Sequence, residues 1–170
     1  MVVLDGASLT IDSLAAVAEG SDEVALDPAA RDRMAAAREV VEEALRSGAV
    51  VYGLTTALAE RKSVMLDAGA RQGFSRYLIR GHLIAQGPLA PAPAVRAAMV
   101  CLVNGFAKGA AGVRPELAEM LVDALNSGLV PAVRSQSQHS PSGGHRGPAA
   151  PRHCCDYPPP ARAARREFPV

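Results

Sequence analysis

Residues 28–47 constrain the fold of this chain more than any other segment, because they read as one long helix. Asp27 precedes the segment as an N-cap, Pro28 occupies the first helical position, and Gly48 follows its end. The apolar positions step by three and four and predict one buried stripe, formed by Ala30, Met34, Ala37, Val41, Ala44 and Leu45. The composition agrees, since the chain is 49% hydrophobic but only 4% aromatic and has no Trp. A core of Ala, Val and Leu suits closely packed helices better than a β-sandwich.

Capping residues, prolines and glycines also mark the ends of the other expected elements. Thr10 caps a short helix that Gly20 ends, and Pro115 starts a helix that Gly128 ends. Further helices are expected over residues 67–86 and 91–108, short strands over 2–4 and 50–52, and a loop over 53–65. The sequence therefore predicts a mainly α protein: an N-terminal helical domain, residues 1–134, with a minor short-strand element.

The last 36 residues differ in composition from the rest, so residues 135–170 are expected to form a disordered tail rich in Pro, Arg and His. They hold seven of the 13 prolines and three of the four histidines, but no Leu, Ile or Met. Such a segment buries too little apolar area to offset the entropy of ordering it. A shifted reading frame in a GC-rich gene would produce a change of this kind.

Composition and charge argue against several other classes. The net charge of +1 gives no general reason to expect nucleic acid or a membrane surface as a partner. No apolar run reaches the ~18 residues of a membrane span, and the N-terminus lacks the pattern of a signal peptide. Three cysteines make no disulfide framework, and the adjacent Cys154 and Cys155 beside His153 are poorly spaced for tetrahedral zinc. We expect a cytoplasmic protein with no metal site.

Tyr52 stands where the long helix gives way to an irregular segment, "VYGLTTALAERKSV", and it is the first candidate for chemistry. Gly53 permits a backbone conformation there that other residues resist. A tyrosine serves as a base only when its surroundings lower its pKa from ~10. The alternative, from local sequence alone, is a partly buried packing residue with a satisfied hydroxyl.

Three segments in order resemble the aromatic amino acid ammonia-lyases, which act on histidine, phenylalanine or tyrosine. The Tyr52 segment is similar to the family's Tyr-Gly-Xaa-Xaa-Thr-Gly loop, and "FSRYLIRGHLIAQGPLAP" to the helix after it. "MVCLVNGFAKGAAGVRPELAEMLVDALNSGLVPAV" resembles the next conserved run and its helix. The resemblance covers about residues 4 to 134. The chain departs from the family pattern at residues 57–59, where Ala57-Leu58-Ala59 replaces a Gly-containing segment.

The resemblance implies elimination of ammonia from an aromatic amino acid by a methylidene-imidazolone group, in a homotetramer. It implies that Tyr52 removes the β-proton and that His82 and Leu83 face the substrate ring. A histidine at that place hydrogen-bonds a phenol or an imidazole; the alternative is a surface or satisfied core histidine. Asn104 matches an asparagine near the active site, or it is a helix-packing amide. An aminomutase activity and the choice among the aromatic amino acids stay open.

The tripeptide that would form the electrophile is degenerate in this chain. Pro141-Ser142-Gly143 lies where the family has Ala-Ser-Gly, and Gly144 replaces the acidic residue that follows. Proline stiffens a turn in which cyclisation must press the glycine nitrogen against the preceding carbonyl. Two interpretations follow: a truncated ammonia-lyase that is inactive alone, or a catalytically dead remnant that serves at most as a helical interaction module.

Overall fold

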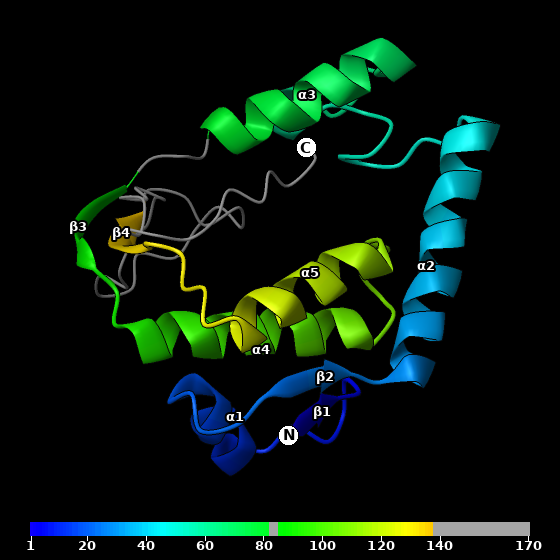
Figure 1. The fold of residues 1–170 in the computed structure, drawn as a ribbon. Helices are drawn as coiled ribbons and strands as arrows, with labels where there is room; N and C mark the ends of the chain where they lie inside the picture. Colours follow the sequence, from blue (N-terminus) through cyan, green and yellow to red (C-terminus); the bar gives the residue numbers. More distant parts are fainter. Residues whose placement is uncertain (82–84, 138–170) are drawn as a thin grey trace. The chain divides into compact units, whose positions relative to one another are not determined.

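The computed structural model describes residues 1–81 and 85–137, in two compact units. The first unit consists of residues 1–81 and 91–130, and the second has residues 85–90 and 131–137 described. The helices are α1 (Ile11–Ala18), α2 (Pro28–Ser47), α3 (Ala68–Gly81), α4 (Ala92–Ala107) and α5 (Pro115–Asn126) (Figure 1). The strands are β1 (Val2–Leu4), β2 (Val24–Leu26), β3 (Ala85–Leu89) and β4 (Arg134–Ser137), and a short 3-10 helix, η1, spans Ala59–Arg61.

The helix ends confirm the predicted caps, and the mainly α class is confirmed with them. The Thr10 hydroxyl accepts a hydrogen bond from the Ser13 N–H at 3.2 Å, and the Asp27 carboxylate accepts one from Ala30 at 2.9 Å. Gly48 ends α2 with a φ of 68°. The stripe on α2 is weaker than predicted: Ala30 and Met34 are buried, and its four later members are half-buried.

Two of the predicted elements are wrong in part. The helix expected over residues 67–86 does not reach Gln86, because Ala85–Leu89 forms β3. Gly87, with a φ of 85°, and Pro88 cannot continue a helix. The strand expected at 50–52 is a turn, in which the Val51 N–H donates to the Thr55 hydroxyl at 2.8 Å. That hydroxyl captures the backbone group that a strand would have offered to a neighbour.

The strand β4 includes the first three residues of the segment that was expected to be disordered. It pairs antiparallel with β3, and the Arg134 guanidinium donates to the Gly87 carbonyl at 3.0 Å. Backbone pairing needs no apolar side chains, which is why the composition of this segment did not indicate a strand. The rest of the segment, residues 138–170, lies outside the described residues.

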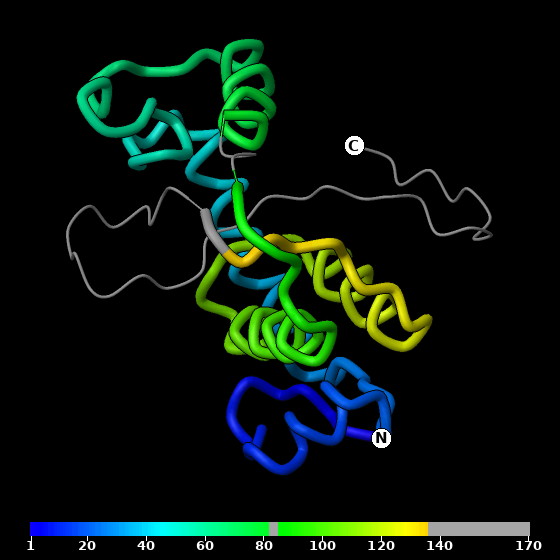
Figure 2. The backbone as a smooth tube through the Cα atoms, turned by 90° about the vertical axis from the view of Figure 1, so that its left-hand side faces the viewer, coloured from blue at the N-terminus to red at the C-terminus, as the bar shows by residue number. Residues whose placement is uncertain are grey.

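The core of the first unit lies where α1, α4 and α5 meet the parallel pair β1 and β2. The views in Figures 1 and 2 agree that α4 and α5 lie side by side, with α1 packed against α4. The largest fully buried side chains are Leu4, Met34, Leu125, Val17, Val24, Val100, Val103, Thr55 and Thr56. Apart from Met34 and the loop residues Thr55 and Thr56, these are the Val and Leu side chains of the core that the composition favoured.

Two polar side chains tie these elements together. Arg96 of α4 is 9% exposed and donates to the carbonyls of Val17 and Leu125, at 2.8 and 2.9 Å. Both carbonyls lie in the last turns of helices, and each also accepts a backbone N–H from just beyond its helix, that of Gly20 or Gly128. The Asn126 amide pairs with both backbone groups of Val24, which extends the small sheet.

Candidate active-site loop

The candidate site is the segment from residue 52 to residue 66, called here the Tyr52 loop, which follows α2. Gly53 opens it with a φ of 73°, and a Cβ built on Gly53 would lie 2.9 Å from the Leu58 Cδ2 atom. The turn therefore favours glycine for its dihedral angle, whereas the end of the Leu58 side chain could move aside for a Cβ. Backbone hydrogen bonds from Leu54 and Thr55 to the Val51 carbonyl, at 3.1 and 3.0 Å, close it.

Two buried threonines form the floor of the Tyr52 loop. Thr55 is fully buried, and its hydroxyl donates to the Ala49 carbonyl at 2.6 Å while accepting the bond from Val51. Thr56 is 1% exposed and pairs across the loop with Met65 in an isolated antiparallel bridge. The Leu66 N–H donates to the Thr55 carbonyl at 2.8 Å. The loop thus has an internal hydrogen-bonded scaffold beneath its outer residues.

The Tyr52 side chain lies on the outside of this scaffold. It is 63% exposed. Its hydroxyl accepts a hydrogen bond from the Ala59 N–H at 3.2 Å. A hydroxyl held by one donor still has its proton and a further lone pair for another group. The phenol of Tyr52 is therefore oriented by one hydrogen bond and accessible from solvent.

The other candidate residues are placed only in part. His82, Leu83 and the tripeptide Pro141-Ser142-Gly143 lie outside the described residues, as does the His153-Cys154-Cys155 cluster. Whether Tyr52 and His82 share a face therefore stays a prediction. Asn104 is placed: its amide oxygen accepts a hydrogen bond from the Gly6 N–H at 2.9 Å, which joins α4 to the segment after β1. This contact is what a helix-packing amide makes.

Sequence reasoning missed two residues of the loop. The role of Thr55 had a signal, because a threonine four positions after Val51 in a glycine-containing turn favours side-chain to backbone bonding. The Ala59 N–H, which holds the Tyr52 hydroxyl, had none. Its backbone has a φ of 52°, and alanine is not a residue from which a positive φ is expected.

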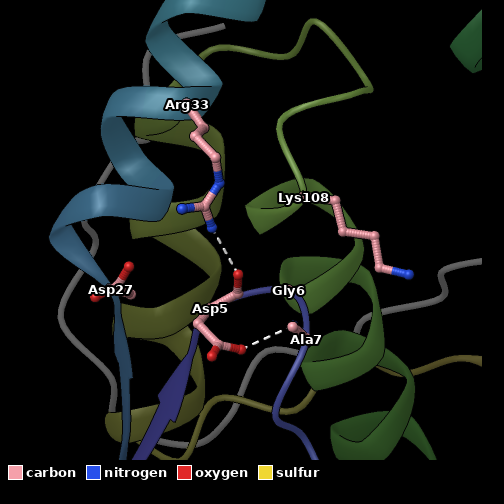
Figure 3. A pocket seen from close by; sticks show the side chains of 6 residues that line it. All are labelled: Asp5, Gly6, Ala7, Asp27, Arg33 and Lys108. Atoms are coloured by element: carbon pink, nitrogen blue, oxygen red, sulfur yellow. Dashed lines mark hydrogen bonds between the residues drawn. The ribbon is translucent and has the colours of Figure 1, made fainter.

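A cavity of about 490 Å³ lies in the first unit, between the end of β1 and the start of α2 (Figure 3). Three of its four charged side chains are already used by the fold, the fourth being Lys108. The Asp5 carboxylate accepts from Ala7, the Asp27 carboxylate caps α2, and Arg33 donates to the carbonyls of Asp5 and Ala107. We interpret it as a structural junction. Among residues 1–81 and 85–137 no helix could cross a membrane, and no cluster of three metal-ligating side chains occurs.

Comparison with known proteins decides the family. A family model described as aromatic amino acid lyase matches residues 9–144. The chain belongs to this family. Histidine ammonia-lyase of Caldanaerobacter subterraneus is 35% identical over 142 residues, which are 84% of this chain and 28% of that protein. Histidine ammonia-lyase of Symbiobacterium thermophilum is 37% identical over 138 residues, 81% of this chain and 27% of that protein.

Solved structures of this lyase family share the fold. Tyrosine aminomutase from Streptomyces globisporus is 29% identical with a TM-score of 0.76, over 81% of this chain and 26% of its own. Histidine ammonia-lyase from Trypanosoma cruzi is 30% identical with a TM-score of 0.74, and the match covers 81% of this chain and 27% of that protein. The chain spans about 28% of the length of the curated relatives it matches. It therefore corresponds to one part of a much longer family member.

Proposed function

We propose that this chain is the part of an aromatic amino acid ammonia-lyase that carries the proton-removing tyrosine, and that it is inactive alone. The observation that carries the proposal is the Tyr52 loop: an exposed phenol on a hydrogen-bonded scaffold, in a chain that belongs to the aromatic amino acid lyases. The reaction would be the non-oxidative loss of ammonia from an amino acid. Several of its most similar relatives are named histidine ammonia-lyase, so histidine is the first substrate to test.

Tyr52 would supply the proton transfer at its Oη atom. The Ala59 N–H, 3.2 Å away, donates to the hydroxyl oxygen and would fix the orientation of the phenol. The buried Thr55 and Thr56 would hold the loop against which the phenol is set. His82 and Leu83 would contact the substrate ring, and a histidine there could donate to or accept from an imidazole or a phenol. General base catalysis of this kind contributes typically 10²–10⁴-fold.

The family's methylidene-imidazolone would supply the electrophile that makes the β-proton removable, and this chain's residues do not fit its formation. Pro141 stands in place of the alanine, and its ring fixes φ in the tripeptide that has to cyclise. Gly144 removes the acidic neighbour. We infer that Pro141-Ser142-Gly143 does not form the group, and that elimination would require the family's own tripeptide and the further subunit-forming helices of an intact homotetramer.

A chimaera tests the role of Tyr52. Residues 1–137 of this chain, a junction that keeps β4 paired with β3, replace the matching part of the Caldanaerobacter subterraneus histidine ammonia-lyase. We expect the chimaera to release ammonia from histidine and Tyr52→Phe to lower kcat by about 10²-fold or more, because it removes a hydroxyl and little volume. Tyr77→Phe, at a tyrosine of α3 that is 71% exposed, is the matched control and should keep kcat within about twofold.

The results of the chimaera assay distinguish the proposed function from the alternatives. Equal kcat values for Tyr52→Phe and its control, in chimaeras with equal helical circular dichroism, would exclude Tyr52 as the base. A chimaera that folds and assembles but releases no ammonia would favour the second candidate, a catalytically dead remnant. The same assay with phenylalanine and tyrosine as substrates reports specificity, and conversion to a β-amino acid would indicate an aminomutase.

A further inference from the structure

Ala59 has a backbone conformation that, among the described residues, is otherwise taken only by glycines. In the described part of the chain, residues with positive φ are Gly6, Gly20, Gly48, Gly53, Gly87, Gly109, Gly112, Gly128 and, as the one non-glycine, Ala59 at 52°. In this region the Cβ of an L-residue comes too close to the following carbonyl oxygen. The methyl group of Ala59 therefore raises the energy of the conformation in which the residue is held.

The surrounding hydrogen bonds hold Ala59 in this conformation from both sides. Before it, the Ala57 N–H donates to the Val64 carbonyl at 3.0 Å, and Ala57 is only 4% exposed. After it, the Lys62 N–H donates to the Ala59 carbonyl at 3.1 Å within η1. Strained residues persist when their neighbours over-determine them in this way. The Ala59 side chain is itself exposed, so its methyl group gains no burial that would offset the strain.

The strained residue is also the one that holds Tyr52. The Ala59 N–H is the donor to the Tyr52 hydroxyl, so the strain and the hydrogen bond belong to the same closed arrangement of the loop. Opening the loop would relieve the strain at Ala59 and break its hydrogen bond to the Tyr52 hydroxyl. We propose that the methyl group of Ala59 weakens the closed form of the Tyr52 loop and so sets how often the Tyr52 hydroxyl is held. This inference concerns the loop of the proposed function but depends on no catalysis.

A glycine at position 59 should reverse the usual effect of an alanine-to-glycine change. Such a change normally destabilises, since glycine has more backbone freedom to lose. At Ala59 the relief of strain should outweigh that entropy and shift the loop about three- to tenfold toward the closed form. Tyr52→Phe should shift it the other way, because the Ala59 N–H loses its acceptor.

Limited digestion of the full chain with trypsin measures this equilibrium. Arg61 and Lys62 are exposed and lie two and three residues after Ala59, so cleavage there reports opening of the loop when opening and closing are fast. Cleavage after Arg46, in the last turn of α2, is the internal reference. We expect Ala59→Gly to slow cleavage at Arg61 and Lys62 about three- to tenfold relative to Arg46, and Tyr52→Phe to accelerate it. Unchanged or faster cleavage in Ala59→Gly, or unchanged cleavage in Tyr52→Phe, would overturn the proposal.

Ala36→Gly is the matched control, because Ala36 is exposed in α2 and has an ordinary helical backbone. It should lower the thermal unfolding temperature, whereas Ala59→Gly should keep or raise it. A drop in Ala59→Gly equal to that in Ala36→Gly would show that no strain resides at residue 59. The digestion needs no substrate and no electrophile, so a failed role for Tyr52 as a base would leave this result unaffected.

Discussion

The Asp5 carboxylate shows how one side chain can hold a turn at the surface. Its Oδ1 atom accepts hydrogen bonds from the backbone N–H groups of Ala7 and Ser8, both at 2.8 Å. The N–H of Ser8 and then that of Ala7 lower the pKa of Asp5 from 3.8 to about 2. Because these donors favour the charged form, the turn is tied most firmly when the carboxylate is ionised.

The sign of the resulting pH dependence follows from the lowered pKa. The unfolded chain binds the proton more readily than the folded chain, so this contribution to stability is complete above the ordinary pKa of 3.8 and is lost as the pH falls through about 2. We expect Asp5→Asn to make the decline in stability over this window shallower, as measured by urea midpoints at successive pH values. Asp123→Asn, at an exposed aspartate of α5, is the control. Parallel pH profiles for Asp5→Asn and the unchanged chain would contradict the assignment.

At the scale of elements, Arg96 joins three helices. Its guanidinium on α4 binds the carbonyls of Val17 at the end of α1 and Leu125 at the end of α5. A cation there also meets the negative ends of two helix dipoles. The packing of α1 and α5 against α4 therefore depends on one buried polar side chain as well as on the aliphatic core.

Arg96→Met should show this dependence. It keeps much of the apolar volume but leaves two buried carbonyls without a charged donor, so we expect a loss of about 2–4 kcal/mol in the free energy of unfolding. Urea denaturation followed by circular dichroism measures it. Arg31→Met removes a surface ion pair with Glu119 at 2.5 Å and should move the midpoint far less. Equal shifts in the two variants would mean that Arg96 contributes no more than a surface arginine.

At the scale of the whole molecule, the proposal predicts a folded chain without lyase activity. The purified protein should have helical circular dichroism but release no ammonia from histidine, phenylalanine or tyrosine, because Pro141 interrupts the tripeptide that would form the electrophile. The Caldanaerobacter subterraneus enzyme, assayed in parallel, is the positive control. Release of ammonia above background, abolished by Ser142→Ala, would show that Pro141-Ser142-Gly143 does cyclise and that the chain is active by itself.

The sequence by itself determined the features that depend on neighbouring residues. Thr10, Asp27 and Gly48 mark helix ends because a cap satisfies backbone groups within a few positions of itself. Such a cap can therefore be predicted without knowledge of the tertiary structure. The family resemblance also rested on local motifs, and the proposed role of Tyr52 came from that resemblance, whereas its exposure was not predicted. Whether the candidate residues share one site was not decided, because His82 lies outside the described residues.

Only the tertiary structure decided the features that join distant segments. The pairing of β1 with β2 and of β3 with β4 brings together short strands, of which only β1 was predicted, because a strand of three to five residues is stabilised by its partner. Arg96 is buried because two helix ends converge on it. Ala59 takes a positive φ because bonds on both sides hold it there, against its own preference. For the strands and Arg96 the energy comes from contacts between residues far apart in the chain, whereas Ala59 is held by several bonds within its own loop.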